Sequence, residues 1–215
     1  MKNRGFTLVR SAKVNTLGFT LVEILVVMAI MAIIGIIMVA IFTNTLRGSN
    51  KSQILAVIKQ NGQAVLENMD KTIRGADNVI CPQQIGPLSD TLVFEKKGVY
   101  TRFRFIPPND ISKRCVNSTN ANGCIQQDFP VVGSDIELFI ETVCSTDLLP
   151  SVITLTDTNS QSGVSVMSGL FTRNKQPGFK DSVTVFFNLG PGVGIPTAVS
   201  SQIDPATFQT TVQLR

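Results

Sequence analysis

The sequence contains no histidine. Catalytic triads of the Ser-His-Asp type, Cys-His nucleophile pairs and zinc sites that use imidazole are therefore excluded. None of the four cysteines forms a CxxC pair, which argues against a zinc ribbon and against a thioredoxin-type redox site. Because no nucleophile or metal-ligand set is recognisable, a membrane-anchored enzyme is the weakest interpretation. We expect no catalytic residue, no metal and no cofactor.

Acidic residues are absent from the first 18 positions, which carry Lys2, Arg4, Arg10 and Lys13. The whole chain has 19 basic and 15 acidic residues, and its formal net charge is +4. Removing the four leading cations from the 19 leaves 15 residues of each sign. Bulk charge therefore does not favour nucleic acid as a partner of the remaining chain, although it does not exclude one.

A long apolar run extends from Phe19 to Phe42, interrupted only by Thr20, Glu23 and Gly35. As an α-helix, its 24 residues would span about 36 Å, which exceeds the roughly 30 Å hydrocarbon core of a bilayer. The run therefore predicts a transmembrane helix over residues 19–42. The excess of cations before it favours a cytoplasmic amino terminus and an exported carboxyl-terminal domain.

The junction before the apolar run is more informative than the residues after it. An ordinary signal peptide is cleaved after its apolar segment at small residues, and residues 43–46 offer no such site. The stretch Gly18-Phe19-Thr20-Leu21-Val22-Glu23, followed by Ile24-Leu25-Val26-Val27, closely resembles the class III signal of type IV prepilins and pseudopilins. A simple single-pass anchor with a glutamate near its end is the alternative interpretation.

This resemblance implies roles for three residues. Prepilin peptidase would cut between Gly18 and Phe19, and the new amino group of Phe19 would be methylated. Glu23 would recruit the subunit into a growing filament made with other pilin subunits. A near copy of the motif at Gly5-Phe6 has Arg10 at the position of the glutamate and polar residues after it, so Gly18 is the expected junction.

The apolar run is followed by a second helical pattern. Ile54, Ile58, Val65, Met69 and Ile73 recur at three- to four-residue steps around Gly62. One helix from about Phe19 to about Gly75 is the simplest interpretation, with possible bends at Gly35, Gly48 and Gly62 or merely close packing there. We therefore divide the chain into a cleaved leader (1–18), a transmembrane helix (19–42), its amphipathic continuation (43–76) and an exported β-rich domain (77–215).

The remaining residues predict strands. A hairpin is expected from Thr91–Glu95 and Val99–Ile106, with an aromatic core face and a solvated face that carries Arg102 and Arg104. Further strands are expected over 135–143, 151–156, 164–172, 182–189 and 207–214. The overall expectation is an α+β pilin fold, in which a long amino-terminal helix packs on a mostly antiparallel sheet.

The four cysteines all follow the apolar run, as expected of an exported domain. Cys115 and Cys124 bracket eight residues in a polar segment, 107–129, which favours a disulfide-closed loop. If that bridge forms, Cys81 and Cys144 remain for each other. Four cysteines nevertheless allow three pairings, and the sequence does not choose among them.

Two further segments contain residues that could bind a ligand. Residues 157–163 place oxygen donors at alternate positions, loosely like a calcium loop, but Gly163 comes one place late and Ser168 stands where glutamate is expected. A plain polar turn is favoured. Arg102 and Arg104 could present a small basic face to DNA, but a solvated strand face is the preferred interpretation.

The leading hypothesis is a non-enzymatic minor subunit of a type IV pilus-like filament, membrane-bound before assembly and then part of a surface or periplasmic filament. The short segments 64–74 and 208–215 look like those of large minor pilins and J-type minor pseudopilins. The alternative is a minor pseudopilin of a type II secretion system, or a competence pilin that binds exported protein or DNA.

Overall fold

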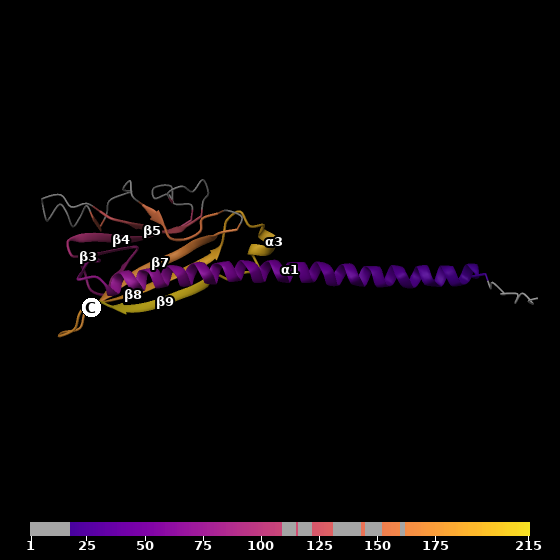
Figure 1. The fold of residues 1–215 in the computed structure, drawn as a ribbon, viewed down its shortest axis with the longest axis horizontal. Helices are drawn as coiled ribbons and strands as arrows, with labels where there is room; N and C mark the ends of the chain where they lie inside the picture. Colours follow the sequence, from indigo (N-terminus) through magenta and orange to yellow (C-terminus); the bar gives the residue numbers. More distant parts are fainter. Residues whose placement is uncertain (1–17, 109–114, 116–121, 131–142, 145–151, 160–161) are drawn as a thin grey trace, which may run out of the picture. The chain divides into compact units, whose positions relative to one another are not determined.

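The computed structural model describes residues 18–108, 115, 122–130, 143–144, 152–159 and 162–215. The chain divides into two compact units, Met1–Leu46 and Arg47–Arg215. A single helix, α1 (Leu21–Arg74), contributes to both units (Figure 1). The long helix predicted from about residue 19 to about residue 75 is therefore confirmed.

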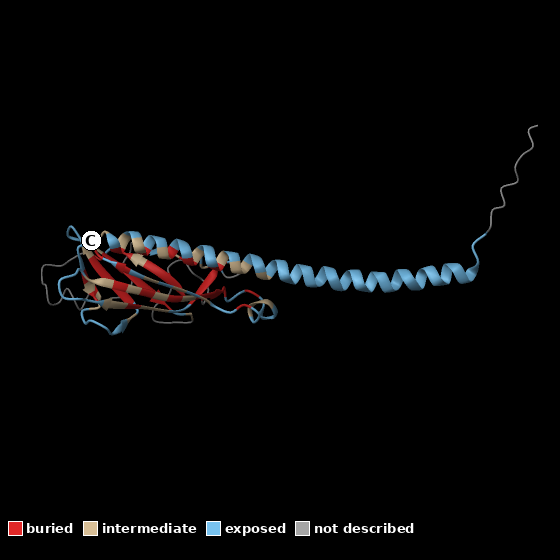
Figure 2. Ribbon diagram, turned by 90° about the horizontal axis from the view of Figure 1, so that it is seen from below, coloured by how far each residue is buried: buried red, intermediate tan, exposed pale blue. Residues whose placement is uncertain are grey.

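Within the first unit, every described residue is exposed, as the uniform pale blue of this part of α1 shows (Figure 2). Within the second unit, α1 is amphipathic. The predicted stripe is buried at Ile58, Gly62, Val65, Met69 and Ile73, and Ile54 is partly buried beside it. The three- to four-residue spacing thus identified the face that packs on the sheets.

The described residues of the second unit also form two antiparallel sheets. The first has the order β1-β3-β4-β5-β6 and the second the order β2-β7-β8-β9. The strands of the first sheet are β1 (Asn78–Cys81), β3 (Thr91–Lys96), β4 (Val99–Ile106), β5 (Cys124–Asp128) and β6 (Ile153–Thr154). Those of the second are β2 (Leu88–Ser89), β7 (Val164–Asn174), β8 (Ser182–Pro191) and β9 (Ala206–Gln213), with a short helix α3 (Thr197–Ser200) before β9.

One hydrophobic core joins α1 to both sheets. Phe105 of β4 stacks on Phe171 of β7 with ring centroids 4.5 Å apart, and Phe187 of β8 stacks on Phe208 of β9 at 5.3 Å. The ring of Phe208 in turn lies where a Cβ atom on Gly62 would be. A glycine in α1 therefore allows the helix to approach an aromatic ring of the second sheet.

The predicted hairpin is confirmed as β3 and β4, paired from Thr91 with Arg104 to Lys96 with Val99. The strands predicted over 164–172, 182–189 and 207–214 correspond to β7, β8 and β9. The strand predicted over 151–156 is shorter, because only Ile153–Thr154 form β6. The strand predicted over 135–143 lies, apart from its last residue, outside the described residues.

The polar segment 107–129 was predicted to be a loop, and for its last part this is wrong. Cys124–Asp128 form β5, which pairs with β4 from Arg102 with Asp128 to Ile106 with Cys124. The sequence Cys-Ile-Gln-Gln-Asp shows no apolar alternation. Its polar side chains Gln126 and Asp128 are nevertheless buried.

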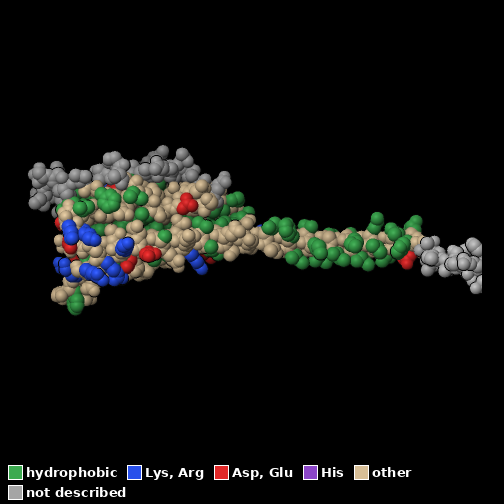
Figure 3. All heavy atoms as spheres, in the orientation of Figure 1, with side chains coloured by type: hydrophobic (Ala, Val, Ile, Leu, Met, Phe, Trp, Pro, Cys, Tyr) green, Lys and Arg blue, Asp and Glu red, His purple; other side chains and the backbone are tan. Residues whose placement is uncertain are grey.

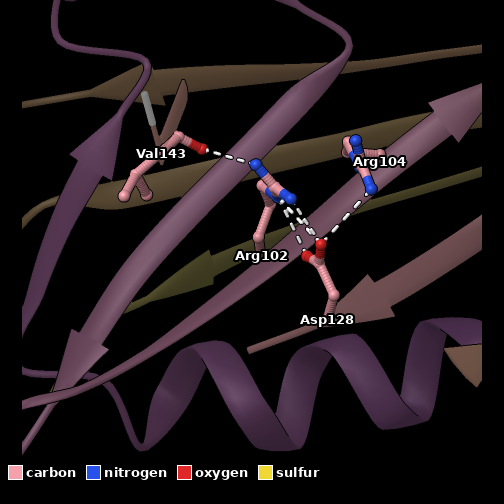
Figure 4. A network of polar contacts seen from close by, with 4 residues as sticks. All are labelled: Arg102, Arg104, Asp128 and Val143. Carbon is pink, nitrogen blue, oxygen red and sulfur yellow. Dashed lines mark hydrogen bonds and ion pairs between the residues drawn. The ribbon is translucent and has the colours of Figure 1, made fainter. Parts of the chain in front are cut away.

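The expectation that Arg102 and Arg104 form a solvated face is also wrong. Their side chains are only 1% and 6% exposed, and both contact Asp128, which is 1% exposed (Figure 4). Arg102 makes a bidentate pair with the Asp128 carboxylate, with Nε 2.9 Å from Oδ1, and its Nη1 donates to the Val143 carbonyl at 2.9 Å. Because these guanidiniums are paired inside the protein, they offer no basic face to DNA.

The structure joins Cys81 to Cys144 and Cys115 to Cys124, and it contains no free cysteine. The first bridge ties the end of β1 to the residue after Val143, whose carbonyl accepts from Arg102. A covalent link and a charged hydrogen bond thus hold this point of the chain on the first sheet.

Candidate functional site at the start of the long helix

The amino terminus of α1 is capped by two side chains that bond to one another's backbone. Thr20 Oγ1 accepts from the Glu23 backbone N–H at 3.2 Å, and Glu23 Oε2 accepts from the Thr20 backbone N–H at 2.9 Å. The Thr20 hydroxyl also donates to Glu23 Oε2 at 3.0 Å. This is a reciprocal capping box, which satisfies N–H groups that a helix start leaves without helical partners.

The capping box fixes where the Glu23 carboxylate lies. It is bent back over the first turn onto Thr20, where both the backbone N–H and the hydroxyl donate to it. The positive end of the helix dipole favours a negative charge at this position. The arrangement therefore holds one carboxylate close to the point where a cleaved chain would begin.

The predicted junction itself is open. Gly18 and Phe19 precede the helix and are both exposed, and no atom lies within 4 Å of the position of a Cβ on Gly18. Both residues of the predicted junction are therefore accessible in the described part of the chain. All three predicted residues, Gly18, Phe19 and Glu23, lie within one turn of the start of α1.

Thr20 was not identified from the sequence as a functional residue. Its signal was present, because a threonine followed three residues later by glutamate, just before an apolar run, is the sequence signature of a capping box. In the hydropathy pattern, however, Thr20 is only an interruption of the apolar run. In the structure it is the direct hydrogen-bond partner of Glu23.

The first half of α1 presents hydrophobic side chains along its whole visible length, with an acidic side chain at its amino-terminal end (Figure 3). Within the described residues, α1 is the one helix long and apolar enough to cross a membrane. Its apolar side chains from Phe19 to Phe42 are exposed and belong to none of the hydrophobic clusters formed by the described residues. An apolar surface of this extent requires lipid or other protein to cover it.

The described residues on either side of positions 160–161 are held together by hydrogen bonds. Asp157 Oδ1 accepts from the Asn159 N–H at 3.0 Å, and Asn159 Oδ1 accepts from the Ser162 N–H at 3.2 Å. The Asp157 N–H donates to Asn61 Oδ1 of α1, beside an open hollow lined by Val57, Gln60, Asn61, Ala64, Asp157 and Ser162. Among described residues, no group of three or more His, Cys, Asp or Glu side chains could hold a metal here or elsewhere.

Comparison with known families gives a match over residues 14–42 to the Prokaryotic N-terminal methylation motif. This is the class III signal of type IV pilin-like precursors, a family of structural rather than enzymatic proteins, and it covers the junction, the capping box and the apolar run. No curated protein and no solved structure matches the chain. The motif and the α+β arrangement of a long helix on antiparallel sheets together support a type IV pilin-like precursor.

Proposed function

We propose that this chain is a non-enzymatic minor subunit of a type IV pilus-like filament. Prepilin peptidase cleaves it between Gly18 and Phe19, the Phe19 amino group is methylated, and the mature subunit assembles through the apolar half of α1. Before assembly, residues 19–42 span the membrane with the amino terminus in the cytoplasm. The domain formed by residues 77–215 is exported and becomes part of the filament.

The position of Glu23 carries this proposal. A carboxylate within an apolar membrane helix costs up to about 2.5 to 3.5 kcal/mol, and less near the interface. Such a residue therefore needs a partner, and the capping box directs its carboxylate toward the end of the helix. After cleavage, the ammonium of Phe19 in the same or a neighbouring subunit would offset the cost of burying Glu23.

Cleavage would leave the capping box intact. Thr20 would become the second residue of the mature chain, so its backbone N–H would remain an amide that donates to Glu23. The new terminus would consist of a single residue before the cap. We infer that this spacing brings the positive terminus and the carboxylate together, ready to pair within or between subunits.

The proposal is tested by Glu23→Ala in cells that assemble the filament. The variant should be processed normally but recovered poorly in the sheared filament fraction. Glu67→Ala is the matched control, because Glu67 is an exposed glutamate of the same helix beyond the apolar run. Normal incorporation of Glu23→Ala would count heavily against the proposal.

Cleavage is tested separately by mass spectrometry of the mature amino terminus. The expected terminus is N-methylated Phe19, and Gly18→Leu should leave the precursor intact. A chain that keeps Met1 in cells with active prepilin peptidase would contradict the proposed processing.

A further inference from the structure

The turn that joins β7 to β8 exposes an aromatic residue between two lysines. We call residues 175–180, with the sequence Lys-Gln-Pro-Gly-Phe-Lys, the hairpin tip. All six residues are exposed, and Phe179 has 65% of its surface accessible although the same unit has a large hydrophobic core. In Figure 1 the hairpin tip protrudes beside the carboxyl terminus.

An ion pair and backbone hydrogen bonds fix the strand ends from which the hairpin tip extends. Arg173, just before β7 ends, donates from Nε to Asp181 Oδ2 at 2.8 Å and from Nη1 to the Pro82 carbonyl at 3.3 Å. Asp181 also accepts at its backbone carbonyl from the Leu214 N–H at 3.0 Å. The turn closes by a 3.1 Å bond from the Phe179 N–H to the Gln176 carbonyl.

A glycine in the tip completes this geometry. Gly178 has φ +83°, a left-handed conformation that glycine adopts without strain. The chain therefore turns sharply just before Phe179, and the bond to Gln176 fixes the residue on the outside of the turn. The exposure of Phe179 follows from a defined local fold.

Other apolar side chains flank the hairpin. Strand β2 pairs with β7 through Leu88 and Thr172, and the Gly86 N–H donates to the Arg173 carbonyl at 3.0 Å. This pairing brings residues 85–88 alongside the hairpin, where Ile85 and Leu88 are 55% and 67% exposed. A group of exposed apolar side chains on one end of an exported domain indicates an interaction surface.

The same end carries a surplus of accessible cations. Lys175, Lys180 and Arg215 are exposed, whereas the nearby Asp181 is paired with Arg173. The end of α1 adds Lys71, and the β3–β4 turn, which passes close to Gly75, adds Lys96 and Lys97. Of the nearby acids, Asp70 is paired with Arg74. The two carboxylates set against these six cations are Asp77, which accepts from the Lys97 backbone N–H, and the half-buried Glu95. Figure 3 shows Lys and Arg side chains gathered at this end of the second unit.

We propose that the hairpin tip docks on an anionic phospholipid surface, with Phe179 inserted at the interface and Lys175 and Lys180 against the lipid phosphates. Aromatic and aliphatic side chains enter the headgroup boundary, while flanking lysines are attracted to anionic lipid. The aliphatic Ile85 and Leu88 favour lipid over nucleic acid, because single-stranded nucleic acid is recognised by stacking on aromatic rings. This inference does not depend on filament assembly.

The full chain provides the test when its apolar helix is anchored in neutral phosphatidylcholine vesicles. Fluorescent vesicles with 30 mol% phosphatidylglycerol should be captured at low salt, and pure phosphatidylcholine vesicles should not. Lys175→Gln and Lys180→Gln should each lower capture on the order of fivefold. Phe179→Ser should lower it on the order of tenfold, and higher salt should weaken capture by all forms that retain the lysines.

Lys51→Gln with Lys59→Gln is the matched control, because it removes two cations from α1 far along the chain from the hairpin. It should leave capture unchanged, and thermal unfolding should show that the tip variants remain folded. Three outcomes would overturn the proposal: no capture of anionic vesicles, equal loss in the control pair, or binding of a labelled single-stranded oligonucleotide without capture of vesicles.

Discussion

The ring of Phe208 in β9 occupies the space beside Gly62 of α1 where any other residue would place its Cβ atom. The outer end of the ring points at Gly62, and the same ring stacks on Phe187, which restricts its movement. Gly62 is therefore required by packing between the helix and the second sheet. Of the possibilities considered for this position from the sequence, close packing is the one observed, and the helix does not open there, since α1 continues through Gly62 as one helix.

Gly62→Ala should destabilise the folded chain. Alanine favours a helix by about 1 kcal/mol over glycine, but forcing a side chain into a packed core costs about 1 to 3 kcal/mol. We expect a net loss of up to about 2 kcal/mol in thermal unfolding of the full chain in detergent. Gly48→Ala is the control, because it has open space around it and should be neutral or stabilising.

A second substitution distinguishes this contact from a general effect on the helix. Phe208→Leu in the Gly62→Ala background should recover part of the loss, because the smaller side chain makes room for the methyl group. Additive losses from the two substitutions would show that the ring and the glycine are not coupled.

Asp128→Ala should be among the most damaging substitutions in the chain. It leaves the buried Arg102 and Arg104 without the carboxylate that meets both, and breaking a buried pair in this way costs about 3 to 5 kcal/mol. Asp70→Ala removes an exposed i,i+4 pair with Arg74 and should cost no more than about 0.5 kcal/mol. Similar unfolding midpoints for the two variants would contradict this account.

The two disulfides should differ in their contribution to stability. The Cys81–Cys144 bridge closes a span of 63 residues and the Cys115–Cys124 bridge a span of 9. The chain-entropy relation gives about 4 kcal/mol for the longer span and about 2.5 kcal/mol for the shorter one. The variant with both Cys81 and Cys144 replaced by serine should therefore unfold at a lower urea concentration than the variant with Cys115 and Cys124 replaced. The reverse order would mean that native contacts, not span length, determine the stability contributed by each disulfide.

Thr20 should matter to the proposed assembly as a positioning residue. Thr20→Val removes the hydroxyl that bonds Glu23, whereas Thr20→Ser keeps it. We expect the valine variant to be processed but to enter filaments several-fold less well, and the serine variant to behave as the parent. Loss of an N-cap costs about 0.5 to 2 kcal/mol, enough for that effect. Equal incorporation of the two variants would show that the Thr20 hydroxyl has no role in assembly.

The parts of the fold that could be predicted from the sequence are those in which the apolar side chains are the buried ones. The stripe from Ile58 to Ile73 and the aromatic face of β4 belong to this class. The prediction failed for the opposite face of β4, because a buried arginine looks the same in sequence as a solvated one. The burial of Arg102 depends on Asp128, 26 residues away, and on the Val143 carbonyl, 41 residues away.

In the candidate site, too, some residues were predictable from the sequence and one was not. Gly18, Phe19 and Glu23 were predicted because their order and spacing form a recognisable motif. Thr20 lies among them, but its role depends on hydrogen bonds between its hydroxyl and Glu23. A hydropathy pattern records threonine only as a less apolar residue, so that pattern could not show this role.

The change of environment along α1 predicts how freely each part of the helix can vary between related chains. Residues 18–50 contact little of their own protein, so the surrounding medium sets what is acceptable, and many apolar sequences would serve equally well. From Ile58 onward, each buried position faces particular neighbours in the two sheets. A chimera that replaces residues 24–46 with another apolar helix should keep the fold of the second unit, whereas an equal exchange over 54–74 would require a matching change in the sheets.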